Sequence, residues 1–192
     1  MKLVLASTSL QRRAILEQLR IPFDVVAPLY EEHDPSDAEP VQLVRAHAEG
    51  KARSVHVDGR VTLGVDTTVH LDGRLYAKPT DERGARAMLG DLVGRAHLVV
   101  SGLCLLGPGF AVVEHDVTHV TFRGLEPSEI DAYVSAGEWR GRAGGYAIQG
   151  LGGRLVARIE GDYLNVVGLP GSLLIDLLTA HAPNLLHLPA KG

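Results

Sequence analysis

The sequence is poor in the features that mark membrane, secreted and nucleic-acid-binding proteins. It has one cysteine among 192 residues, so no disulfide can form within the chain. No apolar run approaches the roughly 20 residues that span a bilayer. The amino-terminal segment also has too short an apolar core for a signal peptide. The net charge is −4, and no long tract of lysine and arginine is present to bind polymeric nucleic acid. These absences predict a globular cytoplasmic protein.

Well-known catalytic motifs are also missing. The glycine-dense segment at residues 141–153 lacks a Gly-Lys-Ser/Thr ending, so it is not a P-loop. It does not stand between a strand and a helix in a GxGxxG pattern, as a dinucleotide-binding fingerprint would. No His-Glu-x-x-His pattern and no G-x-S-x-G elbow occur, which argues against a catalytic zinc site and a serine hydrolase. Any activity must therefore come from another arrangement of polar residues.

The stretch from residue 64 to residue 79 reads GVDTTVHLDGRLYAKP. Its Asp72-Gly73 pair predicts a β-hairpin, because both central positions of a type I′ turn need positive φ. The first strand carries Asp66 and the returning strand carries Lys78, so both charges could face one ligand. Taken alone, the stretch favours a hairpin whose two charges are merely solvated.

The amino terminus predicts a strand at residues 2–6 and then a helix with Ser9 as its N-cap. Gln11, Arg12 and Arg13 stand in the first turn, where the positive end of the helix dipole makes acidic side chains preferable. Two arginines beside free backbone N–H groups and hydroxyls therefore indicate a phosphate-binding site. The alternative is that both guanidiniums point into water.

Two further charged residues are candidates for the same site. Glu32 lies in an acidic loop after a strand predicted at residues 21–28. A carboxylate there can ligate Mg²⁺, although charge runs are usually solvated. Lys51 lies on a helix that begins at Pro40, at the edge of the apolar stripe. It therefore either extends to solvent or reaches a polar site.

The remaining pattern completes an α/β protein. Strands predicted at residues 97–106 and 110–122 form a long antiparallel hairpin at the centre of the sheet. A further strand is predicted at residues 154–161. Gln149, in the glycine-dense segment, has a donor and an acceptor on one amide and is suited to contacting a base edge. The alternative for that segment is a flexible loop.

The charged candidates form one chemical set without a covalent nucleophile: Arg12, Arg13, Glu32, Lys51, Asp66 and Lys78. Transfer at phosphorus to water needs neutralised oxygens, a held leaving group, a divalent ion and a carboxylate that positions the water. The set therefore indicates attack by water on a phosphoanhydride.

The order of motifs resembles the Maf family of nucleoside triphosphate pyrophosphatases over essentially the whole chain. The matching segments are LASTSLQRR from residue 5, the Glu31-Glu32 pair, EGKA at 49–52, GVDTTV at 64–69, AKP at 77–79, VTF at 120–122, RAGGYAIQGLGG at 142–153 and GDYLNVVGLP at 161–170. The resemblance implies hydrolysis of a nucleoside triphosphate to the monophosphate and pyrophosphate with Mg²⁺ or Mn²⁺. It also implies one domain over residues 1–192, built like inosine-triphosphate pyrophosphatases. In that fold a curved mixed sheet with flanking helices forms two lobes around a central cleft, commonly in a homodimer.

The resemblance also implies roles for individual residues. Asp66 matches the family's proton-accepting aspartate, and the other active-site charges match Glu32, Lys51 and Lys78. The phosphate-binding start of the first helix matches Ser7, Arg12 and Arg13. We further expect Mg²⁺ or Mn²⁺ to bridge Glu32 and Asp66 to the phosphates. Substrate choice is associated with the positions of Gln11, Thr67 and Gln149. Thr67 with Gln149 resembles the subgroup that acts on dTTP and UTP, whereas Gln11 replaces an arginine of that subgroup.

The resemblance thus predicts a dTTP and UTP pyrophosphatase that removes non-standard nucleotides or controls nucleotide pools. Two alternatives remain open at this point. One is a 7-methyl-GTP pyrophosphatase. The other is a regulator of septum formation that senses nucleotides without hydrolysing them.

Overall fold

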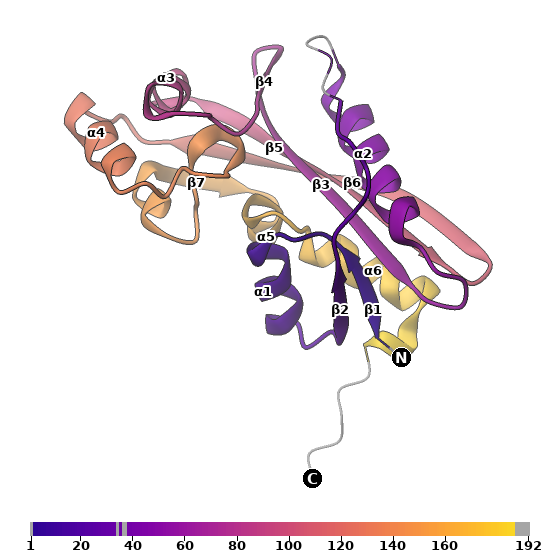
Figure 1. Cartoon of the computed structure of the whole chain (residues 1–192). Helices are drawn as coiled ribbons and strands as arrows, with labels where there is room; N and C mark the ends of the chain where they lie inside the picture. The colour runs from indigo at the N-terminus through magenta and orange to yellow at the C-terminus, as the bar shows by residue number, and fades with distance from the viewer. Residues whose placement is uncertain (1, 34, 36–37, 187–192) are drawn as a thin grey trace.

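The computed structural model describes residues 2–33, 35 and 38–186 and has the predicted α/β architecture (Figure 1). The strands are β1 (Leu3–Ala6), β2 (Phe23–Val26), β3 (Thr62–Leu71), β4 (Arg74–Tyr76), β5 (Ala96–Gly107), β6 (Phe110–Phe122) and β7 (Val156–Glu160). The α-helices are α1 (Leu10–Gln18), α2 (Pro40–Val55), α3 (Glu82–Leu92), α4 (Pro127–Ser135), α5 (Tyr163–Val167) and α6 (Gly171–His181). Short 3₁₀ helices are η1 (Ala143–Gly145), η2 (Leu151–Leu155) and η3 (Pro183–Leu185).

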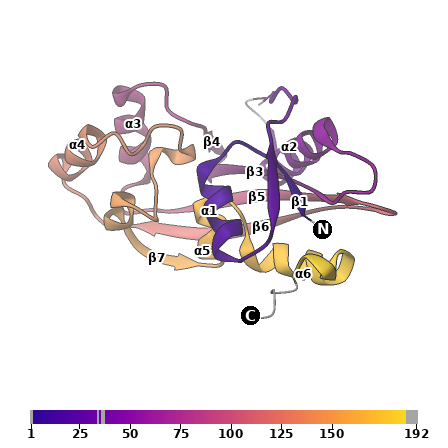
Figure 2. The same ribbon diagram turned by 60° about the horizontal axis from the view of Figure 1, so that its bottom comes forward.

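The strands form one mixed sheet in the order β2-β1-β3-β5-β6-β7, with β4 paired to β3. β1 is parallel to β2 and β3, whereas the other pairs are antiparallel. The predicted central hairpin is confirmed, since β5 and β6 pair from Ala96–Thr121 to Gly107–Phe110. Figures 1 and 2 show this hairpin running the length of the molecule, with α2 and α6 on opposite faces of it. Among the described helices, none combines the length and the hydrophobicity that a membrane-spanning helix requires.

Local sequence signals set several element boundaries as predicted. The Ser9 side chain caps α1 by accepting a hydrogen bond from the Arg12 backbone N–H. Pro40 occupies the first turn of α2, where its missing N–H costs nothing. Asp72 and Gly73 both have positive φ, 49° and 79°, as a type I′ turn between β3 and β4 requires.

Other boundaries differ from the prediction. The prediction that the returning strand carries Lys78 is wrong, because β4 ends at Tyr76 and Lys78 follows it on the way to α3. The strand predicted at residues 154–161 is confirmed only from Val156 onward. The residues before it form η2, in which Gly152 packs so closely on the Ala147 backbone that a side chain would not fit. The glycine-dense segment is therefore tightly folded in this part.

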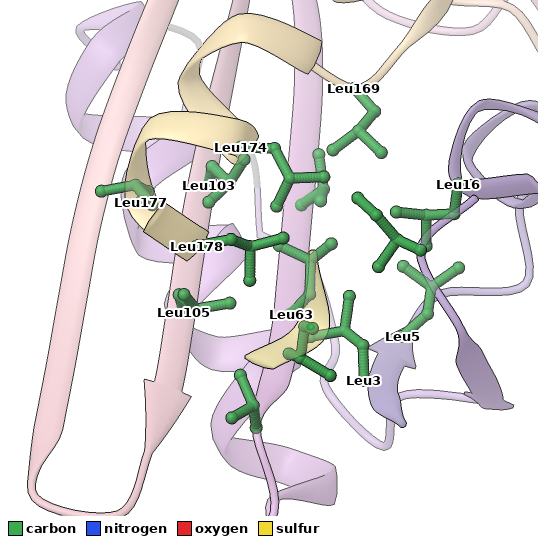
Figure 3. Close-up of a cluster of buried hydrophobic side chains, with 14 of the residues drawn as sticks. Leu3, Leu5, Leu16, Leu63, Leu103, Leu105, Leu169, Leu174, Leu177 and Leu178 are labelled. Atoms are coloured by element: carbon green, nitrogen blue, oxygen red, sulfur yellow. The ribbon is translucent and has the colours of Figure 1, made fainter. Parts of the chain in front are cut away.

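Buried side chains form two large hydrophobic clusters that meet along β3. The first cluster joins β1, α1 and α6, and it includes Leu63 and Val65 of β3 (Figure 3). The second joins α3, α4 and the segment around η1, and it includes Val69 and Leu71. Because side chains alternate along a strand, Thr67 lies on the same face between the two clusters. The division into two lobes stays a prediction.

Helix α2 covers the opposite face of the sheet, and its backbone lies close to two glycines of the strands beneath it. A Cβ at Gly64 would stand 2.0 Å from the Ala48 carbonyl oxygen, and one at Gly102 would stand 2.1 Å from that of Val44. The backbone of α2 therefore rests directly on β3 and β5. Asp66 is two residues after Gly64, so its side chain points to the same face, toward α2.

Replacement of Gly64 by alanine is expected to lower the free energy of unfolding by about 2 kcal/mol, because the added methyl group pushes α2 off the sheet. The matched control is Gly90→Ala on the exposed side of α3, where a Cβ meets nothing within 4 Å. That change should raise the free energy of unfolding by about 0.5–1 kcal/mol through helix propensity. Urea unfolding measures both, and equal effects of the two substitutions would contradict the close approach.

Candidate active site

Strand β3 changes its neighbour near its middle, and the change leaves an opening in the sheet. On one edge, β1 pairs with Thr62 and Leu63, and β4 pairs with Val69 to Leu71. Among the described strands, none pairs with residues 64–68 on that edge. Asp66 and Thr67 therefore stand beside the carboxyl end of β1, where Ser7 and the start of α1 also lie. In open α/β sheets, ligands bind at such switch points.

A cavity of about 500 Å³ occupies this opening. All the residues that the sequence predicted for the site line it, except Arg13. They are Ser7, Gln11, Arg12, Glu32, Lys51, Asp66, Thr67, Lys78 and Gln149. Arg13 is exposed on α1, in agreement with the alternative that its guanidinium points into water. The volume falls within the range of small-molecule sites, about 300–1,000 Å³.

Lys51 bridges the two carboxylates of the site. Its Nζ lies 2.6 Å from Asp66 Oδ1 and 2.6 Å from Glu32 Oε1. Lys51 and Asp66 are both buried, whereas the Glu32 side chain is 42% exposed. Of the two predictions for Lys51, the structure confirms the one in which it reaches a polar site. A buried charge pair of this kind is costly to break, because each partner would be left without compensation.

His47, one helical turn before Lys51, completes the surroundings of Asp66. It is 3% exposed, and its Nδ1 lies 3.4 Å from Asp66 Oδ2. Its Nε2 lies 3.2 Å from the carbonyl oxygen of His33. Glu32, His47 and Asp66 offer ligand atoms that all lie within 4.8 Å of one another. One nitrogen and two carboxylates at this spacing could hold a divalent cation.

The surroundings of Asp66 keep its carboxylate ionised. Burial by itself raises the pKa of the carboxyl, since it disfavours the charged form. The hydrogen bonds and charges of His47, Lys51 and Arg12 outweigh burial and hold the pKa of Asp66 well below its ordinary value. At neutral pH the site therefore contains a carboxylate that can accept a proton or bind a cation.

Arg12 ties the start of α1 to β3 and to the end of α5. Its Nε donates to the Gly168 carbonyl at 3.0 Å, and its Nη1 donates to Ser7 Oγ at 3.1 Å. A longer contact of 3.5 Å joins Nη2 to Thr67 Oγ1. Burial lowers the pKa of Arg12, with Asp66 and Glu32 opposing the shift, and a guanidinium remains charged in such a site. Arg12 thus places a fixed positive charge in the cavity.

The Thr67 hydroxyl is already engaged by the protein. It lies 2.9 Å from Ser101 Oγ and 3.4 Å from the Gly168 carbonyl oxygen. This hydroxyl is therefore placed to shape the cavity. Gln149 and Lys78, in contrast, are exposed residues of the cavity lining, so their polar groups can meet a ligand from solvent.

The sequence predictions missed His47 and Arg142 as residues of the site. His47 precedes Lys51 by four residues, which places both on one face of α2, and this spacing was a usable signal. Arg142 lines the cavity, and its buried Nε has no hydrogen-bond partner among the described residues. With Arg142, the lining carries more positive than negative charge, which suits a polyanion.

The chain is similar to known proteins over nearly its whole length. A family model described as Maf-like protein matches residues 2–181. A relative named dTTP/UTP pyrophosphatase, from Symbiobacterium thermophilum, is 43% identical over 180 residues, 93% of each chain. Another of that name, from Nitratidesulfovibrio vulgaris, is 42% identical over 193 residues, which cover 98% of this chain and 92% of the relative. Among solved structures, the Staphylococcus aureus Ham1 protein is 16% identical with a TM-score of 0.44, over 64% of this chain and 72% of that one.

Replacement of Lys51 by methionine is expected to lower the free energy of unfolding by about 3 kcal/mol, because Asp66 stays buried without its ammonium partner. Lys78→Met is the matched control. Lys78 is exposed in the same cavity, so the same change there should alter stability by less than about 0.5 kcal/mol. Urea unfolding at neutral pH measures both variants. If both variants lost the same free energy of unfolding, the contacts of Lys51 with the two carboxylates would contribute no more to stability than an exposed lysine does.

Proposed function

The chain belongs to the family of Maf-like proteins, and on that premise we propose that it hydrolyses nucleoside triphosphates, with dTTP and UTP preferred. The observation that carries the proposal is that one cavity gathers an excess of cations with two carboxylates. A triphosphate needs positive side chains along its oxygens, and its hydrolysis needs a carboxylate near the attacked phosphorus. The names of the relatives support the choice of dTTP and UTP.

In the proposed reaction, a water oxygen bonds to the α-phosphorus, and the bond from that phosphorus to the bridging oxygen breaks. Pyrophosphate and the monophosphate leave as products. Asp66 aligns the water and accepts its proton. Arg12, Lys51, Lys78 and Arg142 bind the phosphate oxygens and stabilise the charge on the leaving pyrophosphate.

Glu32 and Asp66 are the proposed ligands of a divalent cation, Mg²⁺ or Mn²⁺. When bound, such an ion neutralises phosphate charge and polarises the phosphorus–oxygen bonds. Gln149 is proposed to contact the edge of the base, since its amide both donates and accepts. Thr67 shapes the base pocket, and Gln11 lies in the same lining. The homodimer and the cytoplasmic location that were expected from the sequence stay predictions.

A substrate panel tests the preference. With Mn²⁺ or Mg²⁺, pyrophosphate release from dTTP and UTP should be at least about tenfold faster, as kcat/KM, than release from 7-methyl-GTP. Faster turnover of 7-methyl-GTP would overturn the proposed base preference. Binding of dTTP without release of pyrophosphate would instead indicate a nucleotide sensor.

The variant Asp66→Asn tests the role of the carboxylate. It should abolish turnover but leave the dissociation constant for dTTP within about tenfold, as expected for a group that acts mainly in the transition state. Asp72→Asn, in the turn that follows the same strand, is the matched control. It removes an exposed ion pair with Arg95 and should leave turnover unchanged. A near-normal rate for Asp66→Asn would remove Asp66 from this role.

A further inference from the structure

His47 lies where a ligand of the cation would lie, beside the carboxylate oxygen of Asp66 that Lys51 does not contact. Lys51 contacts the Oδ1 atom of Asp66, whereas His47 faces Oδ2. A cation bound at Oδ2 therefore leaves the ion pair with Lys51 in place. His47 is nearly completely buried on α2, and the Tyr30 ring packs against it edge-on with centroids 5.7 Å apart. Its imidazole is thus held in one orientation.

The hydrogen bond on the far side of the ring determines which nitrogen carries a proton. His47 Nε2 faces the His33 carbonyl oxygen, which can only accept, so Nε2 is the donor. The other nitrogen, Nδ1, faces the Asp66 carboxylate at 3.4 Å. If Nδ1 carried only its lone pair, it would repel the carboxylate oxygen at that distance. A positive charge between the two atoms removes the repulsion. That charge is either a proton on Nδ1 or a cation bound by both atoms.

The surrounding atoms favour a bound cation. Two ligands at right angles around a cation, each about 2.1 Å from it, stand about 3 Å apart, close to the separation of Nδ1 and Oδ2. Glu32 supplies a third ligand atom within 4.8 Å. An imidazole whose second N–H donates to a backbone carbonyl is also the usual arrangement of a metal-binding histidine. Without a cation, a proton on Nδ1 would make the hydrogen bond to Asp66, and the spectroscopic test below distinguishes that pair from a bound cation.

We propose that His47 is a third protein ligand of the divalent cation, beside Glu32 and Asp66, and that it makes the site select Mn²⁺ over Mg²⁺. The proposal rests on the proposed function insofar as that function requires a cation at the two carboxylates. Mg²⁺ strongly prefers oxygen ligands, whereas first-row transition metals accept imidazole nitrogen. The affinity for Mn²⁺ relative to Mg²⁺ is therefore higher at a site that includes the imidazole than at a site built from carboxylates alone.

The test uses the 192-residue chain with Mn²⁺ and no nucleotide. Electron spin-echo envelope modulation detects nitrogen bound directly to Mn²⁺. The wild-type spectrum should contain this nitrogen signal, and His47→Leu and His47→Gln should both lack it. His33→Gln is the matched control, because it removes the neighbouring imidazole but keeps the backbone carbonyl that faces His47. It should retain the signal.

Metal titrations give an independent measure. The dissociation constant for Mn²⁺ should rise at least about tenfold in both His47 variants. That for Mg²⁺, measured by competition, should change by less than about threefold. Two variants are used because a buried leucine and a buried glutamine disturb folding in different ways. Circular dichroism identifies the one that keeps the fold.

A wild-type spectrum without nitrogen modulation would overturn the proposal, and so would a nitrogen signal that persists in a folded His47 variant. Weaker Mn²⁺ binding without any nitrogen signal in the wild type would also overturn it, since His47 would then only position Asp66. None of these measurements depends on turnover. Pyrophosphate release from dTTP and UTP tests the proposed function separately, so failure of one proposal can be told from failure of the other.

Discussion

The buried ion pair between Lys51 and Asp66 is the interaction on which the site depends. Two charges taken out of water are stable only when they stay in contact, and here the two Cα atoms belong to different elements, α2 and β3. Their contact requires α2 to lie against the sheet without intervening side chains. Gly64 and Gly102 make that possible, because a Cβ at either position would collide with the backbone of α2. The ion pair in the cavity therefore depends on glycine at positions 64 and 102.

The position of the cavity follows from a change in strand pairing. Parallel pairing with β1 ends at Leu63, and antiparallel pairing with β4 begins at Val69. Hydrophobic clusters lie on either side of this interval and hold β3 in place at both ends. The polar residues between the clusters are therefore presented to a ligand by a rigid strand. On one side of the cavity, the Arg12 side chain is fixed by its hydrogen bond to the Gly168 carbonyl. Rigid support of this kind reduces the ordering that binding must otherwise supply.

Local signals made part of this structure predictable from sequence. Ser9 and the Asp72-Gly73 pair act within a few residues of themselves, so their helix cap and turn follow from neighbouring atoms. The role of His47 depends on β3, a separate strand, and on a loop carbonyl, so periodicity could place it on a face of α2 but could not name its partners. Tertiary packing also explains why Arg12 lines the cavity and Arg13 does not. They are adjacent in sequence, but only Arg12 points toward the opening in the sheet, and tertiary packing decides which one does.

The low pKa of Asp66 bears on how the proposed hydrolysis would be accelerated. A carboxylate stabilised by His47, Lys51 and Arg12 is a weak proton acceptor, so acceptance of the water's proton by Asp66 contributes less to the rate than its alignment of that water. Phosphoryl transfer has a loose transition state in most accounts, with little bond formation to the nucleophile, and therefore demands little activation of the water. What it demands is alignment and compensation of charge on the leaving group. The fixed carboxylate of Asp66 aligns the water, and the excess of cations compensates the charge on the leaving pyrophosphate. The cations that make Asp66 a weaker base therefore also favour binding of a triphosphate in the cavity.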